Sequence, residues 1–158
     1  MFGVNPTFDE TDEEYHRHMG FGRADANEED PICGNTWQAP ADQSTKSIDW
    51  EEKGMMEPVK NQGMCGSCWA FSTVSILESR WMIAGNTGEL FSEQYLVDCV
   101  YDVPDSCGTG GFMSEGFEFL MKGGSHADPD SAHYKYTSGS TGSQGSCKEA
   151  ELQEDLRF

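Results

Sequence analysis

Apolar residues recur at helical spacing in the middle of the chain. Between Ala70 and Trp81 they follow one another at steps of four, three and four, which is the period of one helix face. This pattern predicts a long helix that begins near Cys68 and ends near Gly85, where a glycine-bearing turn follows.

Shorter helices are predicted on either side of this one. Ser92 can cap a helix that runs through about Cys99, because its hydroxyl accepts from the N–H groups of the first turn. Residues 113–122 favour another helix, and residues 137–146, made of Ser, Thr, Gly and Gln, predict a flexible surface loop. The apolar residues on one side of the 113–122 helix are Met113, Phe117, Leu120 and Met121.

Residues 1–45 differ from the rest, since they are acidic and hold few apolar residues. Thr11 and Glu14 form a capping box, which predicts a short helix over about 11–19. Residues 24–45 read as a linker. Composition alone also fits a disordered acidic tail.

The charge balance narrows the classes of partner. Ten basic against 28 acidic residues give a net charge of −18, so the chain will not bind nucleic acid or an anionic membrane through its net field. The sequence has no apolar run of about 18 residues that could span a membrane. Its four histidines show no metal-ligand spacing, and we expect neither a metal nor a cofactor.

Cys68 is the candidate nucleophile. A thiol in the first turn of a helix lies near the partial positive charge of the backbone N–H groups, and this favours the thiolate, the nucleophilic form. Two alternatives stay open: a buried structural cysteine, or one half of a redox pair with Cys65. A thioredoxin-like pair needs a preceding strand, and the residues before Cys65 are loop-like.

Several motifs, in order, resemble one enzyme family. Residues 65–69, Cys-Gly-Ser-Cys-Trp, are similar to the sequence around the nucleophile of papain and cathepsin peptidases. Residues 47–50, 58–63 and 92–99 resemble the same family's mature N-terminal half. The chain is therefore identified as a member of the papain-like, cathepsin L-type cysteine peptidases, over roughly residues 46–150.

The resemblance implies roles for specific residues. Cys68 would attack the scissile carbonyl and form a thioester, and Gln62 would donate a side-chain N–H to the oxyanion. The alternative for Gln62 is a solvent-facing loop residue. Other motifs of enzyme chemistry, such as phosphate-binding glycine loops, are absent.

Substrate-binding residues follow from the same resemblance. Gly110 and Gly111 match glycines that let a substrate backbone approach closely, where a Cβ would block it. Phe112 and Met113 match positions that line the pocket for an apolar substrate side chain. The alternative is that both simply begin a core-facing helix.

The resemblance also implies two disulfides, Cys65–Cys107 and Cys99–Cys147, with Cys33 left over. The run from Cys107 to Gly111 has one residue more than the family's usual Cys-Asn-Gly-Gly. Because disulfide geometry is strict, this insertion leaves the first pairing open.

Domain organisation is the main departure from the family pattern. The catalytic His and Asn follow the papain-type nucleophile by ~130–150 residues, more than lie between Cys68 and Phe158. We expect residues 1–45 to be a propeptide remnant and linker. Residues 46–158 are expected to be the mainly helical N-terminal half of an α+β papain-like fold whose β-rich second half is missing.

The expected function is that of a cysteine-type endopeptidase, a zymogen acting on proteins or peptides. The alternative is an inactive truncated fragment that binds inhibitor proteins or the missing C-terminal half. Cysteines that pair indicate an oxidising compartment, although residues 1–30 lack a secretory signal. We expect a lysosomal, vacuolar or extracellular setting for the intact parent.

Overall fold

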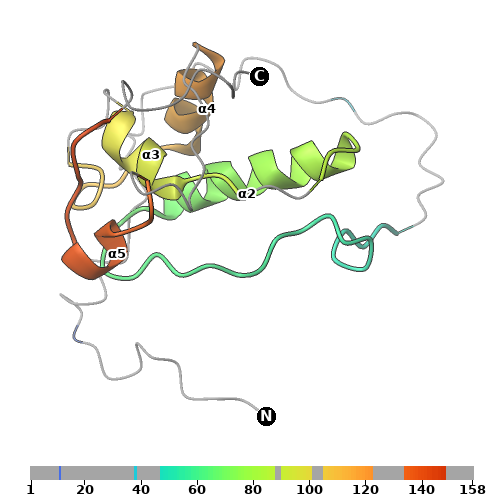
Figure 1. Cartoon of the computed structure of the whole chain (residues 1–158), viewed down its shortest axis with the longest axis horizontal. Coiled ribbons are helices and arrows are strands. Elements are labelled where there is room, and N and C mark those ends of the chain that lie inside the picture. The colour runs from blue at the N-terminus through green and yellow to red at the C-terminus, as the bar shows by residue number, and fades with distance from the viewer. Residues whose placement is uncertain are drawn as a thin grey trace.

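The computed structural model describes residues 11, 38, 47–87, 90–100, 105–122 and 134–148. These residues form the helices α2 (Cys68–Ile83), α3 (Glu93–Cys99), α4 (Met113–Met121) and α5 (Ser138–Thr141). Figure 1 shows α2 as the long central helix, with α3 and α4 on one side of it and residues 47–66 running along the other. Over the described ranges no extended strand is found, which fits the helical half of the predicted α+β fold.

The predicted helices match the observed ones closely. Helix α2 ends at Ile83, and Gly85 follows with a φ of 93° in the left-handed region. At the start of α3 the Ser92 hydroxyl accepts from the N–H of Tyr95 at 3.1 Å, as its capping role requires. Residues 12–19 of the predicted 11–19 helix and the leftover Cys33 lie outside the described residues.

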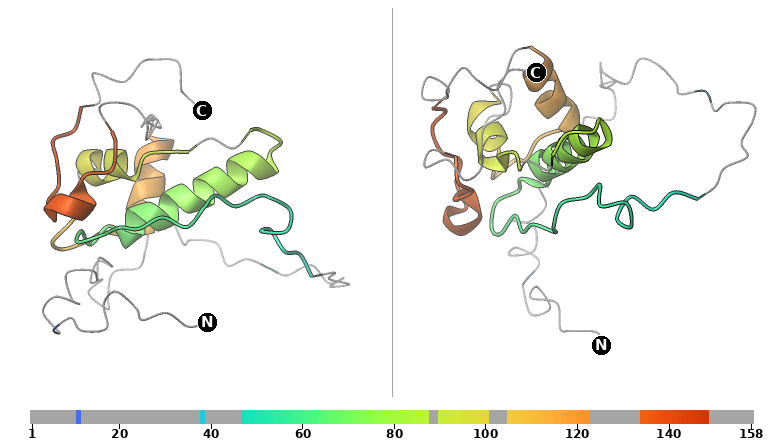
Figure 2. Two further views of the ribbon diagram at one scale, coloured as in Figure 1. Left: turned by 60° about the horizontal axis from the view of Figure 1, so that its bottom comes forward. Right: turned by 45° about the vertical axis from the view of Figure 1, so that its right-hand side comes forward.

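The core forms where α2 packs against α3 and α4 (Figure 2). Trp69 is 1 % exposed, and it packs with buried residues of α3 and of the segments that flank α3. Gly116 lets α4 approach α2 closely, because a Cβ there would lie 2.9 Å from the Thr73 hydroxyl oxygen. The buried core residues are Cys65, Trp69, Ala70, Val74, Phe91, Leu96, Val97, Val100 and Cys107.

Two disulfides tie distant segments together. Cys65 is bonded to Cys107, and Cys99 is bonded to Cys147. The extra residue after Cys107 does not prevent the first bond. A turn accommodates this region, in which the carbonyl oxygen of Asp105 accepts from the N–H groups of Gly108 and Thr109 at 3.0 and 2.9 Å.

The segment 137–146 corrects the prediction of a flexible loop. Its first part is the helix α5, and Ser138 is fully buried. The buried side chain of Gln94 accepts from the N–H groups of Thr137 and Ser138 at 2.8 and 3.0 Å and donates to the Ser138 hydroxyl at 2.8 Å. The buried amide on α3 thus holds the start of the segment, whereas most of residues 140–146 is exposed, as expected of a surface loop.

A charged cluster lies where α2, α3 and the segment before α2 meet. The ammonium of Lys60 donates to Glu78 at 2.6 Å and to Glu93 at 2.7 Å, and both carboxylates are almost fully buried. Burial raises the pKa of Glu78, and its bonds with Lys60 and the Phe91 N–H offset this only in part. Burial alone would lower the pKa of Lys60, but its two carboxylate partners outweigh burial and raise it.

The raised pKa of Glu78 makes stability depend on pH. The folded state holds this proton more tightly than the unfolded state, so the free energy of unfolding rises as pH falls through the folded-state pKa toward the ordinary Glu value of 4.5. It falls again as pH rises through the folded-state pKa. We expect Glu78→Gln to flatten this dependence, measured as the melting temperature across that pH range.

Glu118→Gln is the matched control, because Glu118 pairs with Lys122 on the surface, where its side chain is 41 % exposed. This variant should keep the slope of the unmodified protein. If the melting temperature changes with pH equally in Glu78→Gln and in the unmodified protein, Glu78 is not the cause of the pH dependence.

The Cys99–Cys147 disulfide should contribute strongly to stability. It joins residues 48 positions apart, and the chain-entropy estimate for such a loop is about 4 kcal/mol. We expect the double variant Cys99→Ser/Cys147→Ser to lose about that much free energy of unfolding in urea titrations. A loss below about 1 kcal/mol would show that the 134–148 segment is held by its hydrogen bonds alone.

Candidate active site

Cys68 is the first residue of α2. Its thiol is free and partly exposed, the only free thiol among the cysteines that the structure describes. The N–H groups in the first turn of a helix have no acceptor within the helix, and together they carry the positive end of its dipole. The Ser67 side chain forms no cap bond with them. The thiol therefore lies beside backbone donors that favour negative charge.

The redox alternative for Cys68 is wrong. Cys65, its potential partner, is bonded to Cys107, with an S–S distance of 2.07 Å. The buried structural alternative also fails, because Cys68 is neither bonded nor fully buried. What is left is an accessible sulfur at the end of a helix.

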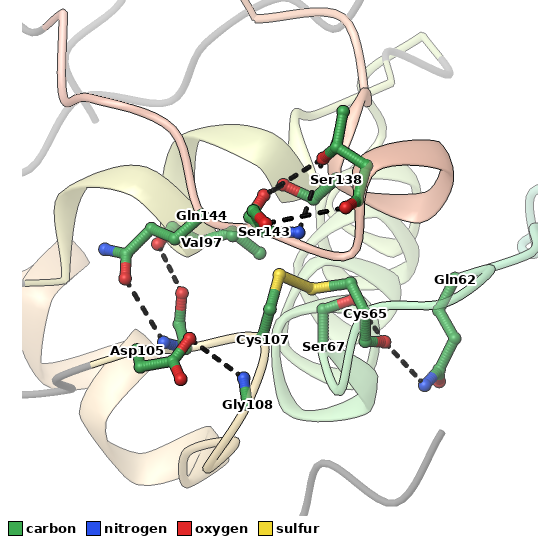
Figure 3. Close-up of a disulfide and its surroundings, with 12 residues drawn as sticks. Gln62, Cys65, Ser67, Val97, Asp105, Cys107, Gly108, Ser138, Ser143 and Gln144 are labelled. Atoms are coloured by element: carbon green, nitrogen blue, oxygen red, sulfur yellow. Dashed lines mark hydrogen bonds between the residues drawn. A yellow bond between two sulfur atoms is a disulfide. The ribbon is translucent and has the colours of Figure 1, made fainter. Parts of the chain in front are cut away.

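Gln62 lies on the loop that leads into α2. Asn61 shapes this loop, since its side-chain oxygen accepts from the N–H of Gly63 at 2.9 Å, and Gly63 has a φ of 62° that favours glycine. The Gln62 amide nitrogen donates to the carbonyl oxygen of Cys65 at 3.0 Å. Figure 3 shows this amide turned toward Cys65 beside the disulfide. The loop thus folds the Gln62 side chain back toward the start of α2.

The segment 105–112 also contacts residues at the start of α2. Besides the disulfide, the N–H of Gly66 donates to the carbonyl oxygen of Cys107 at 3.0 Å. Gly111 lies against Trp69, where a Cβ would come within 3.0 Å of the indole ring. Gly110 has a φ of 72°, again in the region that favours glycine. Both glycines are buried, and Gly111 lies next to the residue that follows Cys68.

Phe112 and Met113 sit at the start of α4, and both are half-buried. The Phe112 N–H donates to the Glu115 carboxylate at 2.7 Å, which fixes the first turn of the helix. Met113 packs against the core and also lines a groove of about 590 Å³ beside α2. The groove's other lining residues include Val59, Phe71 and Ile76. Met113 therefore belongs both to the packing around the core and to the lining of the groove.

The structure thus brings Gln62, Cys68 and the two glycines around the beginning of α2. Sequence reasoning missed Tyr136, whose hydroxyl lies between the Gln62 carbonyl oxygen and the Ser67 hydroxyl. It also missed the cluster around Lys60. The available signal for Tyr136 was a pair of tyrosines, at 134 and 136, ahead of a segment rich in Ser, Thr and Gly.

Two searches of the described residues gave negative results. No group of His, Cys, Asp and Glu side chains among them could hold a metal ion. None of the helices described is both long enough and apolar enough to cross a membrane.

Comparison with known proteins places this site in a family. Residues 44–157 match the model of the family described as papain family cysteine protease. A cysteine proteinase of Trypanosoma brucei brucei is 39% identical over 152 residues, which are 93% of this chain and 32% of that protein. The chain thus spans about a third of the length of this relative.

Solved structures agree with the sequence matches. The digestive procathepsin L2 proteinase from Tenebrio molitor larval midgut has a TM-score of 0.72 at 31% identity, covering 92% of this chain and 46% of that one. The bromelain protease from Ananas comosus, solved in complex with the E64 inhibitor, has a TM-score of 0.58 at 32% identity, covering 70% and 47%. The helical arrangement around Cys68 is therefore a papain-like fold, and the chain belongs to the papain family of cysteine proteases.

Proposed function

We propose that this chain is the nucleophile-bearing half of a cysteine-type endopeptidase that acts on proteins or peptides. The observation that carries the proposal is the free, accessible thiol of Cys68 at the first turn of α2, in a chain of this family. The first turn of α2 places this residue at the positive end of the helix dipole.

In the proposed reaction the thiolate sulfur of Cys68 attacks the scissile carbonyl carbon. The carbonyl oxygen becomes negative, and the Gln62 side chain and the Cys68 backbone N–H donate to it. The C–N bond then breaks, the amine leaves with a proton, and a thioester remains. Water attacks the thioester and releases the acid and the thiol.

A proton acceptor is required for these steps, and in papain-type enzymes it is a histidine oriented by an asparagine. The described residues include no histidine. We therefore propose that the histidine and the asparagine come from a second segment outside the described residues.

The groove beside α2 supports such a second segment. Val59 is fully exposed and Ile76 is 47% exposed, and both line this groove. The cluster of Glu78, Glu93 and Lys60 lies in the same groove. Apolar surface of this kind marks an interface. The same observation favours the second candidate function, a binding polypeptide without activity.

The proposed domain division is a propeptide part at 1–45 and a helical half at 46–158. The family match from residue 44 and the 92% coverage of this chain by a procathepsin structure support it. The two disulfides favour an oxidising setting, such as a lysosome, a vacuole or the extracellular space.

For substrate binding, we propose that Gly110 and Gly111 contact the substrate backbone and that Phe112 and Met113 form a pocket for an apolar side chain. The half-burial of Phe112 and Met113 supports this, since part of each side chain is open to solvent. Gly111 also has a second reason to be glycine, because Trp69 fills the space of a Cβ.

Labelling of Cys68 tests the proposal. We expect an epoxide inhibitor of the E64 type to alkylate the full chain at one site, identified by mass mapping of peptides, because the thiolate opens the epoxide ring. Cys68→Ala should abolish the label. Labelling by iodoacetamide provides the comparison, because it depends on the reactivity of the thiol alone.

Cys33→Ser is the matched control, since it removes another cysteine but leaves α2 unchanged, and it should label fully. If Cys68 stays unlabelled by the epoxide while iodoacetamide modifies it, the proposed nucleophile is wrong. The binding alternative would then be favoured.

A further inference from the structure

The hydroxyl of Tyr136 joins the two parts of the proposed oxyanion site. Its oxygen is 2.7 Å from the Gln62 carbonyl oxygen and 2.7 Å from the Ser67 hydroxyl oxygen. A carbonyl can only accept, so the Tyr136 proton goes to Gln62 and the Ser67 hydroxyl donates to Tyr136. A directed chain of hydrogen bonds therefore runs from the residue before Cys68 to the residue that carries the proposed oxyanion donor.

The tyrosine ring is fixed as well. It meets Phe71, on the first turn of α2, edge to face at a centroid distance of 4.9 Å. Burial raises the pKa of Tyr136 above its ordinary value, which the bond with Ser67 offsets only in part. The phenol thus keeps its proton throughout the neutral and acidic range and remains a donor.

The backbone that follows Tyr136 adds to this contact. The N–H of Met64 donates to the carbonyl oxygen of Gly139 at 2.9 Å. A Cβ at Gly139 would lie 2.9 Å from the Gln62 carbonyl oxygen, so only glycine allows this approach. Gln94 anchors the segment to α3 through the N–H groups of Thr137 and Ser138. The segment 136–139 therefore holds the loop of Gln62, and Gln94 in turn holds this segment against α3.

We propose that Tyr136 is a positioning residue for the oxyanion site, fixing the backbone of Gln62 relative to the start of α2. The inference rests on the proposed function. Tyr136 acts through Gln62 and Ser67 and makes no contact with the reacting atoms in this account. Its effect should therefore appear on oxyanion binding and leave the intrinsic reactivity of the thiol unchanged.

The test uses four variants of the full chain. Tyr136→Phe removes one hydroxyl and keeps the ring against Phe71. Tyr134→Phe is the matched control, because Tyr134 is a nearby buried tyrosine whose hydroxyl accepts from Lys148 N–H at 2.5 Å, away from the Gln62 loop. Gln62→Ala removes the proposed donor, and the double variant Gln62→Ala/Tyr136→Phe shows whether the two act together.

The first measurement is hydrogen exchange at the Met64 amide, which does not depend on catalysis. Tyr136→Phe should speed exchange at least about tenfold, since the loop loses a hydrogen bond on each side of the phenol. Tyr134→Phe should leave it within about twofold. Equal exchange rates for Tyr136→Phe and the unmodified chain would overturn the proposal.

The second measurement is affinity for a peptide aldehyde. The Cys68 sulfur adds to the aldehyde carbon, the thiol proton ends on the former carbonyl oxygen, and that oxygen occupies the oxyanion site. Tyr136→Phe should weaken binding about tenfold and leave the iodoacetamide rate unchanged. In the double variant, Tyr136→Phe should cause no loss of aldehyde affinity beyond that of Gln62→Ala. If the two losses add, the positioning role is wrong.

The two failures are distinguishable. If the unmodified chain binds no aldehyde and its Cys68 takes no epoxide, the proposed function fails, and exchange at Met64 alone decides whether Tyr136 fixes the loop. If the unmodified chain binds the aldehyde and Tyr136→Phe binds equally well, the function stands and the inference about Tyr136 is wrong.

Discussion

The packing of Trp69 under the start of α2 is the constraint on which the site depends. Trp69 is almost completely buried, and Gly111 lies flat against its ring because no Cβ fits there. The Cys65–Cys107 disulfide holds the same two segments together one turn away. Cys68 lies between these two fixed neighbours. Its position is therefore set by core packing, which stabilises far more strongly than any single contact within the site.

Electrostatics act on two scales in this chain. The net charge of −18 is a property of the whole chain and bears on solubility. The buried cluster around Lys60 is different, since one ammonium serves two carboxylates and a proton there relieves an excess of negative charge. This cluster and apolar side chains together line the groove beside α2.

Much of this arrangement could be read from local sequence. The spacing from Ala70 to Trp81 located α2, and Ser92 located α3, because both signals depend on residues within one or two turns. The disulfide partners came from the family resemblance, and no local rule could have supplied them. The role of Gln94 was hidden for a different reason. Its buried amide binds the backbone of residues more than 40 positions away, and such a contact produces no periodic pattern in the sequence.

The dependence of the Gln62 loop on residues 134–148 has a consequence for biosynthesis. A ribosome releases the nucleophile long before it releases Tyr136 and Gly139, and the segment carrying them is tied down by a bond that needs oxidation at Cys147. During translation the emerging polypeptide therefore carries its thiol before the segment that holds the Gln62 loop is present. The Gln62 loop can take its described arrangement only after residue 139 has been synthesised.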